Sequence, residues 1–144
     1  MPHEGYVGRD GDDERVAGTV TLIMDGDAVI VVDPGMVACR DALLAALAGH
    51  GPAAGDVEGL QVSLSVRLLR TPGHTAEDIS TVAATPGDLV VCTHAWWGSA
   101  GPAEDPLGAD AGQLHASRAR LLAFATLIVP GHGAAFRPDG STPR

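Results

Sequence analysis

The sequence contains no lysine, so its nine positive charges are all arginines and stand against 18 Asp and Glu residues. The formal net charge of −9 argues against the basic stripes with which nucleic-acid-binding proteins contact phosphates. It does not exclude an enzyme that acts on a polyanion through a metal ion and a few arginines. The acidic run of residues 9–15 predicts a solvated, flexible N-terminal tail over residues 1–15.

Cysteines and long apolar runs are also scarce. Cys39 and Cys92 are far apart and no Cys-x-x-Cys spacing occurs, so we expect buried thiols and neither a disulfide framework nor a cysteine zinc site. No run approaches the 18 apolar residues of a membrane span, and no basic region followed by an apolar one opens the chain. We therefore expect a soluble protein without a signal peptide, in the cytoplasm.

Aromatic residues make up only 3% of the chain, so the core must consist of Val, Leu, Ile and Ala. The 19 glycines and 10 prolines indicate many turns between short strands. A length of 144 residues is that of one domain. We place this domain at residues 16–137, between the acidic tail and a second flexible tail at residues 138–144.

The order of predicted elements favours a mixed fold. Two strands are expected around the Asp25-Gly26-Asp27 turn, and alternating apolar and polar residues predict a single half-buried strand over residues 60–70. The other predicted elements are a helix within residues 36–51, strands at 78–85 and 88–94, a helix at 109–125 and a strand at 126–129. Strands, helix, strands, helix and strand in this order predict an α/β (α+β layered) fold and not a purely parallel, doubly wound sheet.

Three histidines occupy the ends of predicted strands: His74 after residues 60–70, His94 at the end of 88–94, and His132 after 126–129. Strand ends are where sheet proteins assemble sites, and imidazole is the commonest metal ligand. Taken alone, His74 or His132 fits a loop residue hydrogen-bonded to the backbone better than a metal ligand. The matching Pro-Gly-His contexts of His74 and His132 favour a shared metal site.

Four segments resemble the metallo-β-lactamase fold family: GTVTLI, AVIVVDPG, TPGHTAEDISTV and LIVPGHGAAF. The likeness runs from about Thr19 to Arg137. It implies an αββα sandwich with two zinc ions at the sheet edges and hydrolysis by a metal-activated water. It implies that His74 binds the first metal, that His132 binds the second, and that Asp33 supports the site without binding metal.

The family includes glyoxalase-like enzymes and nucleases. The resemblance implies an endoribonuclease that acts on histone pre-mRNA, with RNA as its substrate and the nucleus as a second location beside the cytoplasm.

The principal ligand motif of the family, HxHxDH, is absent, since neither His-x-His nor Asp-His occurs in the sequence. The motif is expected near Val57 and Glu58, where tens of residues found in relatives are missing. His94 stands at the position of the aspartate that bridges both metals. The expected fold is therefore an incomplete αββα sandwich, with at most one zinc ion on His74, His94 and His132.

The missing motif leaves alternatives to a hydrolase open. The chain is also consistent with a catalytically inactive binding relative, with a shortened isoform able to form a homodimer, or with the product of a splicing or gene-model error.

Three further expectations concern residues outside the histidine set. Trp96 and Trp97 are expected to be buried beneath a long loop rather than to form a stacking platform. Residues 103–107 predict a turn. Arg118 and Arg120 in the second helix are expected to be exposed.

Overall fold

The computed structural model describes residues 2–3, 6–10, 13–26, 28–33 and 59–144. Within them lie the strands β1 (Pro2–His3), β2 (Tyr6–Asp10), β3 (Asp13–Ala17), β4 (Val20–Asp25), β5 (Ala28–Val32), β6 (Gly59–Gln61), β7 (Val66–Arg70), β8 (Ile79–Ala84), β9 (Leu89–Thr93) and β10 (Leu127–Pro130), and the helix α2 (Ala111–Leu122). The helix predicted within residues 36–51, with Cys39, lies outside the described residues. No helix in the described ranges is long and apolar enough to cross a membrane.

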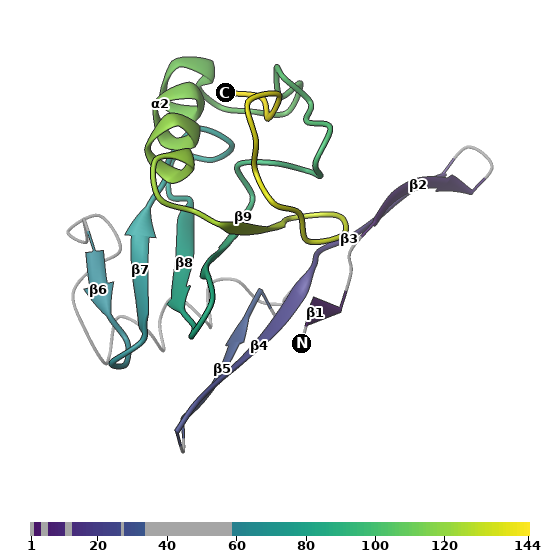
Figure 1. The fold of residues 1–144 in the computed structure, drawn as a ribbon. Helices are drawn as coiled ribbons and strands as arrows, with labels where there is room; N and C mark the ends of the chain where they lie inside the picture. The colour runs from purple at the N-terminus through teal and green to yellow at the C-terminus, as the bar shows by residue number, and fades with distance from the viewer. Residues whose placement is uncertain (1, 4–5, 11–12, 27, 34–58) are drawn as a thin grey trace.

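In the described part of the chain, the largest sheet has five strands in the order β10-β9-β8-β7-β6. Strand β10 is parallel to β9, and the other neighbouring strands are antiparallel. Helix α2 connects β9 to β10, as the crossover between two parallel strands requires, and Figure 1 shows it beside the ends of β7 and β8. The mixed α+β class predicted from the sequence is confirmed.

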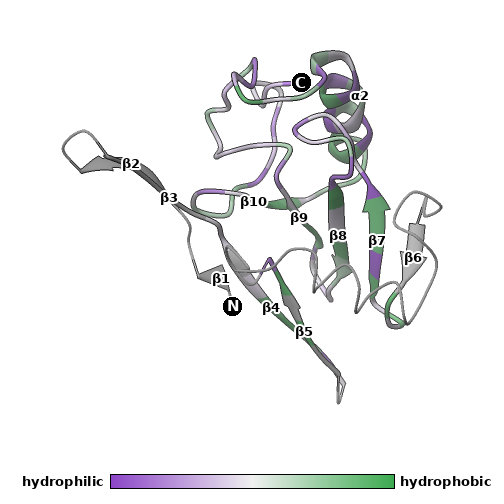
Figure 2. Ribbon diagram, turned by 180° about the vertical axis from the view of Figure 1, so that it is seen from behind, coloured by the Kyte–Doolittle hydropathy of each residue, from purple (hydrophilic) through white to green (hydrophobic). Residues whose placement is uncertain are grey.

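The core lies between this sheet and α2. Its buried side chains come from four strands, the loop after β9, the helix and the connection from α2 to β10: Leu69, Val82, Val91, Ala95, Trp96, Leu114, Leu121, Ala125 and Ile128. Helix α2 carries both hydrophobic and hydrophilic residues (Figure 2), and it begins at Asp110, whose side chain accepts a hydrogen bond from the N–H of Gln113. An amphipathic helix capped in this way can bury one side against the sheet.

Two smaller sheets precede the large one. The first has the order β1-β4-β5, and β2 pairs with β3 in a hairpin that extends away from the large sheet (Figure 1). The sequence predicts a flexible tail over residues 1–15, whereas the structure places β1, β2 and most of β3 there. In the sequence, the apolar residues Tyr6, Val7 and Val16 flank a Gly- and Asp-rich segment, which is a hairpin pattern that the acidic composition obscures.

The β1-β4-β5 sheet is hydrogen-bonded to the large sheet through both ends of β4. Before β4, the N–H of Thr19 donates to the carbonyl of Gly131 at 2.7 Å. At its far end, the Asp25 carboxylate accepts hydrogen bonds from Ser63 Oγ at 2.5 Å and from Ser65 N–H at 3.2 Å. These hydrogen bonds lower the pKa of Asp25. The carboxylate therefore stays ionised where the two sheets meet.

The single strand predicted over residues 60–70 is wrong, because β6 and β7 are two antiparallel strands joined by residues 62–65. The N–H groups of Val62 and Ser63 both donate to the carbonyl of Val66, and Leu64 is fully exposed. The apolar-polar alternation continues through this turn, so the pattern alone cannot reveal the reversal.

Arg118 corrects a further expectation, since its side chain is buried with 1% of its surface exposed. Its guanidinium donates to the carbonyls of Ala95 at 2.7 Å, Ala103 at 2.8 Å and Pro102 at 3.0 Å, and it lies 5.6 Å from the ring of the fully buried Trp96. Burial lowers the pKa of Arg118, and the nearby charge of Asp105 opposes this shift. One side chain thus holds the long loop after β9 on the helix.

The C-terminal residues return to the same loop. Trp96 Nε1 donates to the carbonyl of Pro143 at 2.8 Å, and Asp139 closes a turn by accepting from the N–H and hydroxyl of Ser141. The segment expected as a flexible tail at residues 138–144 thus has a hydrogen bond to the core tryptophan.

We expect Arg118→Met to lower the free energy of unfolding by about 3 kcal/mol or more, because three carbonyl groups lose a buried donor. Arg118→Lys should lose most of the same stability, since an ammonium cannot reproduce the planar fork. The control is Arg120→Met on the exposed side of α2, where we expect a change within about 0.5 kcal/mol. Urea denaturation measures all three variants, and equal effects at the two positions would contradict the role of Arg118.

Candidate metal centre

The sheet topology brings the three candidate histidines to one edge. Strands β7 and β9 are both antiparallel to β8, and β10 is parallel to β9, so these three strands end at the same edge. His74, His94 and His132 follow their ends. The ring centroids of His74 and His94 are 6.0 Å apart, and those of His94 and His132 are 5.3 Å apart.

The loop of His74 is held tightly against the start of α2. Gly73 has φ = 141°, and a Cβ there would lie 2.3 Å from the backbone of Leu114, so only glycine fits. The N–H groups of Ala109 and Asp110 donate to the carbonyls of His74 and Gly73, each at 3.0 Å. The backbone of His74 is therefore held through the carbonyl group on each side of its Cα atom.

The ring of His74 is oriented by Asp105. His74 Nδ1 lies 2.7 Å from Asp105 Oδ2, and the Asp105 side chain has only 1% of its surface exposed. Asp105 also accepts from Leu107 N–H at 2.9 Å and from Trp97 Nε1 at 3.3 Å. Burial raises the pKa of Asp105, but the hydrogen bonds from Leu107 and His74 outweigh this and lower it overall. Because Nδ1 is engaged, a metal ion would bind His74 through Nε2.

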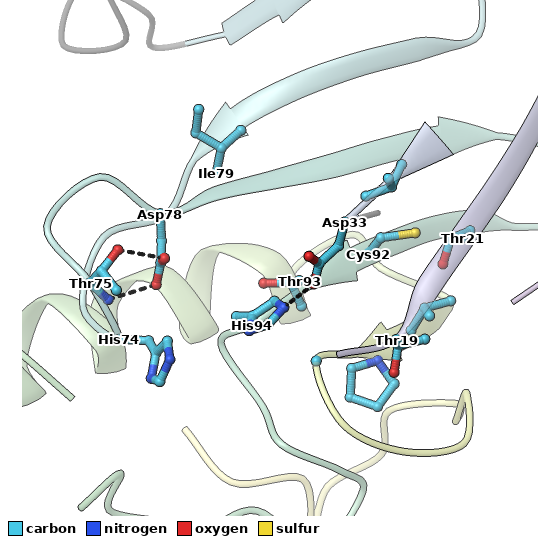
Figure 3. A pocket seen from close by; sticks show the side chains of 14 residues that line it. Thr19, Thr21, Asp33, His74, Thr75, Asp78, Ile79, Cys92, Thr93 and His94 are labelled. Carbon is cyan, nitrogen blue, oxygen red and sulfur yellow. Dashed lines mark hydrogen bonds and ion pairs between the residues drawn. The ribbon is translucent and has the colours of Figure 1, made fainter. Parts of the chain in front are cut away.

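His94 is paired with Asp33, the residue that follows β5 of the β1-β4-β5 sheet. His94 Nε2 lies 2.5 Å from Asp33 Oδ2 (Figure 3), and each side chain has 33% of its surface exposed. Asp33 adopts φ = 51°, a left-handed conformation that aspartate tolerates better than most residues. The bond to Asp33 raises the pKa of His94, with burial opposing it. The Asp33 contact therefore favours the protonated form of His94.

His132 lies between His94 and Trp97. Its ring is edge-on to both, with centroid distances of 5.3 Å and 6.3 Å. The backbone N–H of His132 donates to the carbonyl of Trp97 at 3.1 Å, and the backbone N–H of Gly131 donates to the carbonyl of Trp96 at 3.0 Å. A Cβ on Gly131 would lie 2.9 Å from Nδ1 of His94, so this glycine lets the two histidine loops approach.

A cavity of about 380 Å³ opens between the two sheets beside His74 and His94 (Figure 3). Its walls combine hydroxyl, carboxylate and apolar side chains; they include Thr19, Thr21, Asp33, Asp78, Ile79, Cys92, Thr93 and Val129. Asp78 accepts from the N–H and hydroxyl of Thr75 and so closes the loop that carries His74. Burial raises the pKa of the Cys92 thiol, so this cysteine is a protonated wall residue and the sequence prediction of a buried thiol is confirmed.

The three imidazoles have the donor chemistry of a zinc site, and the ring of His94 lies near the other two, with centroids 6.0 Å from His74 and 5.3 Å from His132. Among the described residues, however, no three or more His, Cys, Asp or Glu side chains are already arranged to hold a metal ion. Asp33 Oδ2 contacts Nε2 of His94, so a metal ion could bind this nitrogen only in place of Asp33.

Comparison with protein-family models and with curated proteins gave no match for this chain. The family resemblance thus rests on the motifs alone.

The sequence identified all three histidines and Asp33 as residues of one region, but it missed Asp105. The residue lies in the segment 103–107, which is predicted only as a turn. Its single signal is an acidic residue within a Pro- and Gly-rich connection. That signal is too common in loops to indicate a partner 31 residues away.

In metal-free protein, we expect the imidazole of His94 to titrate above its ordinary pKa of 6.5, and Asp33→Asn to move this pKa downward. Because the folded-state pKa is raised, the stabilisation is fully present below about pH 6.5 and is lost as the pH rises through the folded-state value. Proton NMR titration of the His94 ring and unfolding measured across this range test both statements. A His94 pKa that is unchanged in Asp33→Asn would contradict the ion pair.

Proposed function

We propose that this chain is a zinc-dependent hydrolase related to the metallo-β-lactamase fold, with a single zinc site on His74, His94 and His132. The observation that carries the proposal is the meeting of these three imidazoles at the common end of β7, β9 and β10, with ring centroids 5.3 and 6.0 Å apart. The mixed large sheet and the smaller sheet beside it support an incomplete αββα sandwich as the fold.

The donor set suits one zinc ion. A catalytic zinc takes three protein ligands and leaves a fourth position for water or substrate. Three histidines supply the ligands of one such zinc ion, and a centre with two zinc ions would need further ligands. A bound zinc ion supplies Lewis acidity for hydrolysis. The cavity of about 380 Å³ beside His74 and His94 provides room for a small substrate.

The residues of the chain prepare this site in different ways. Asp105 directs the ring of His74, and the loop closed by Asp78 holds its backbone. Asp33 pairs with His94 when no metal is present. Metal binding must displace both the proton on His94 and its partner Asp33, so the zinc affinity should rise with pH.

A second candidate function is a binding protein without catalysis. The observation that favours it is the Asp33–His94 pair, which blocks the central imidazole in this structure. The endoribonuclease activity on histone pre-mRNA implied by the resemblance stays a prediction, as does the homodimer.

The test is the stoichiometry of zinc and the effect of each histidine on it. We expect about one equivalent of zinc by elemental analysis, and His74→Ala, His94→Ala and His132→Ala should each weaken binding by about 100-fold or more, beyond the 10- to 100-fold effect of an outer-shell residue. His115→Ala, an exposed histidine on α2, is the matched control and should bind like the wild type.

Hydrolysis of a panel of ester, thioester, β-lactam and single-stranded RNA substrates then separates the two candidates. Turnover that requires zinc and is lost in His132→Ala supports the hydrolase. Zinc binding without turnover favours the binding protein. Less than about half an equivalent of zinc in the wild type would overturn the metal site. So would a His115→Ala variant whose zinc binding is weakened as much as that of His132→Ala.

A further inference from the structure

We propose that Asp105 is the positioning residue of the candidate metal centre: it holds His74 as the Nδ1–H tautomer and thereby keeps Nε2 for the metal. This inference deepens the proposed function, since it concerns the same site. It rests on the contacts of a residue that the sequence motifs of the site do not include.

The first argument is burial. The Asp105 side chain has 1% of its surface exposed, against 19% for His74. A buried carboxylate is retained only where hydrogen bonds compensate its lost hydration, and the N–H of Leu107, the ring of His74 and the indole of Trp97 supply them. Both oxygens of the carboxyl group accept from N–H donors, Oδ1 from Leu107 and Oδ2 from Trp97, so the contacts identify the group as an acceptor.

The second argument is the proton that this acceptor requires. An ionised carboxylate accepts hydrogen bonds and donates none, so His74 must carry a proton on Nδ1, which lies 2.7 Å from Asp105 Oδ2. The neutral ring then has its lone pair on Nε2. A carboxylate on the outer nitrogen of a metal-binding histidine fixes the ring and strengthens it as a ligand.

The third argument is that Asp105 reaches a second histidine through Trp97. Asp105 Oδ2 accepts from both His74 Nδ1 and Trp97 Nε1, and the Trp97 ring is edge-on to His132 with centroids 6.3 Å apart. One oxygen of Asp105 thus contacts His74 directly and also contacts the Trp97 ring that packs against His132.

The scaffold around Asp105 is suited to such a role. Arg118 binds the carbonyls of Pro102 and Ala103, which precede Asp105 by three and two residues. The N–H of Gly108 donates to the carbonyl of Asp105 at 3.1 Å. The backbone of the residue is therefore anchored on both sides.

The experiment is long-range ¹H–¹⁵N NMR of histidine-labelled, metal-free protein at alkaline pH, where imidazoles are neutral. The His74 signals are assigned from their loss in His74→Gln. We expect wild-type His74 to be the Nδ1–H tautomer and Asp105→Asn to lose this preference, because the amide can also donate to Nδ1. Glu104→Gln is the matched control: it removes the same charge from the exposed neighbouring residue and should leave the tautomer unchanged.

Zinc affinity provides the second measurement, and we expect Asp105→Asn to weaken it 10- to 100-fold, with Glu104→Gln unaffected. An Nε2–H tautomer in the wild type would overturn the inference even if Asp105→Asn failed to fold. So would an unchanged tautomer in a folded Asp105→Asn variant. Because the tautomer is read without metal, absence of zinc binding by the wild type would overturn the proposed function and leave the role of Asp105 to be judged from the spectra.

Discussion

The Arg118 guanidinium fixes the loop on which the candidate site depends. It binds three carbonyls of the segment between β9 and α2 and covers the ring of Trp96. That segment carries Trp97 and Asp105, and these side chains reach the loops of His132 and His74. A cation buried in the core therefore determines where polar groups stand at the edge of the sheet. Its cost in lost hydration is offset because all of its nitrogens find carbonyl partners.

The sequence predicted the parts of the site that follow directly from the sheet. A histidine that ends a strand must lie at a sheet edge, and three such strands running in one direction must share that edge. Repeated Pro-Gly-His turns reveal this order without knowledge of any contact. Asp105 and Arg118 could not be found in the same way, because their roles depend on where the long loop folds back. An arginine in an amphipathic helix and an aspartate in a turn are ordinarily exposed to solvent.

Two errors in the predicted elements have a common physical origin. In the segment of residues 60–70, alternation continues across the turn that separates β6 from β7, since Ser63 and Ser65 bind Asp25 at positions where a strand would also place polar residues. In the N-terminal segment, charge suggested a solvated tail where β2 and β3 pair. Both patterns describe which residues prefer water. They do not state which backbone groups pair with each other, and pairing distinguishes a hairpin from a strand or a tail.

The contact between Asp33 and His94 couples the two sheets to the chemistry of the site. Asp33 ends the described part of the smaller sheet, and its left-handed backbone turns the carboxylate toward His94 of the large sheet. An ion that claims His94 must compete with this bond and with the proton that the bond stabilises. The free energy of such metal binding would therefore be reduced by the free energy with which the Asp33–His94 pair holds the two sheets together. Thr19 and Asp25 form further hydrogen bonds to the loops of the large sheet at the two ends of β4, so the attachment of the β1-β4-β5 sheet does not depend on Asp33 alone.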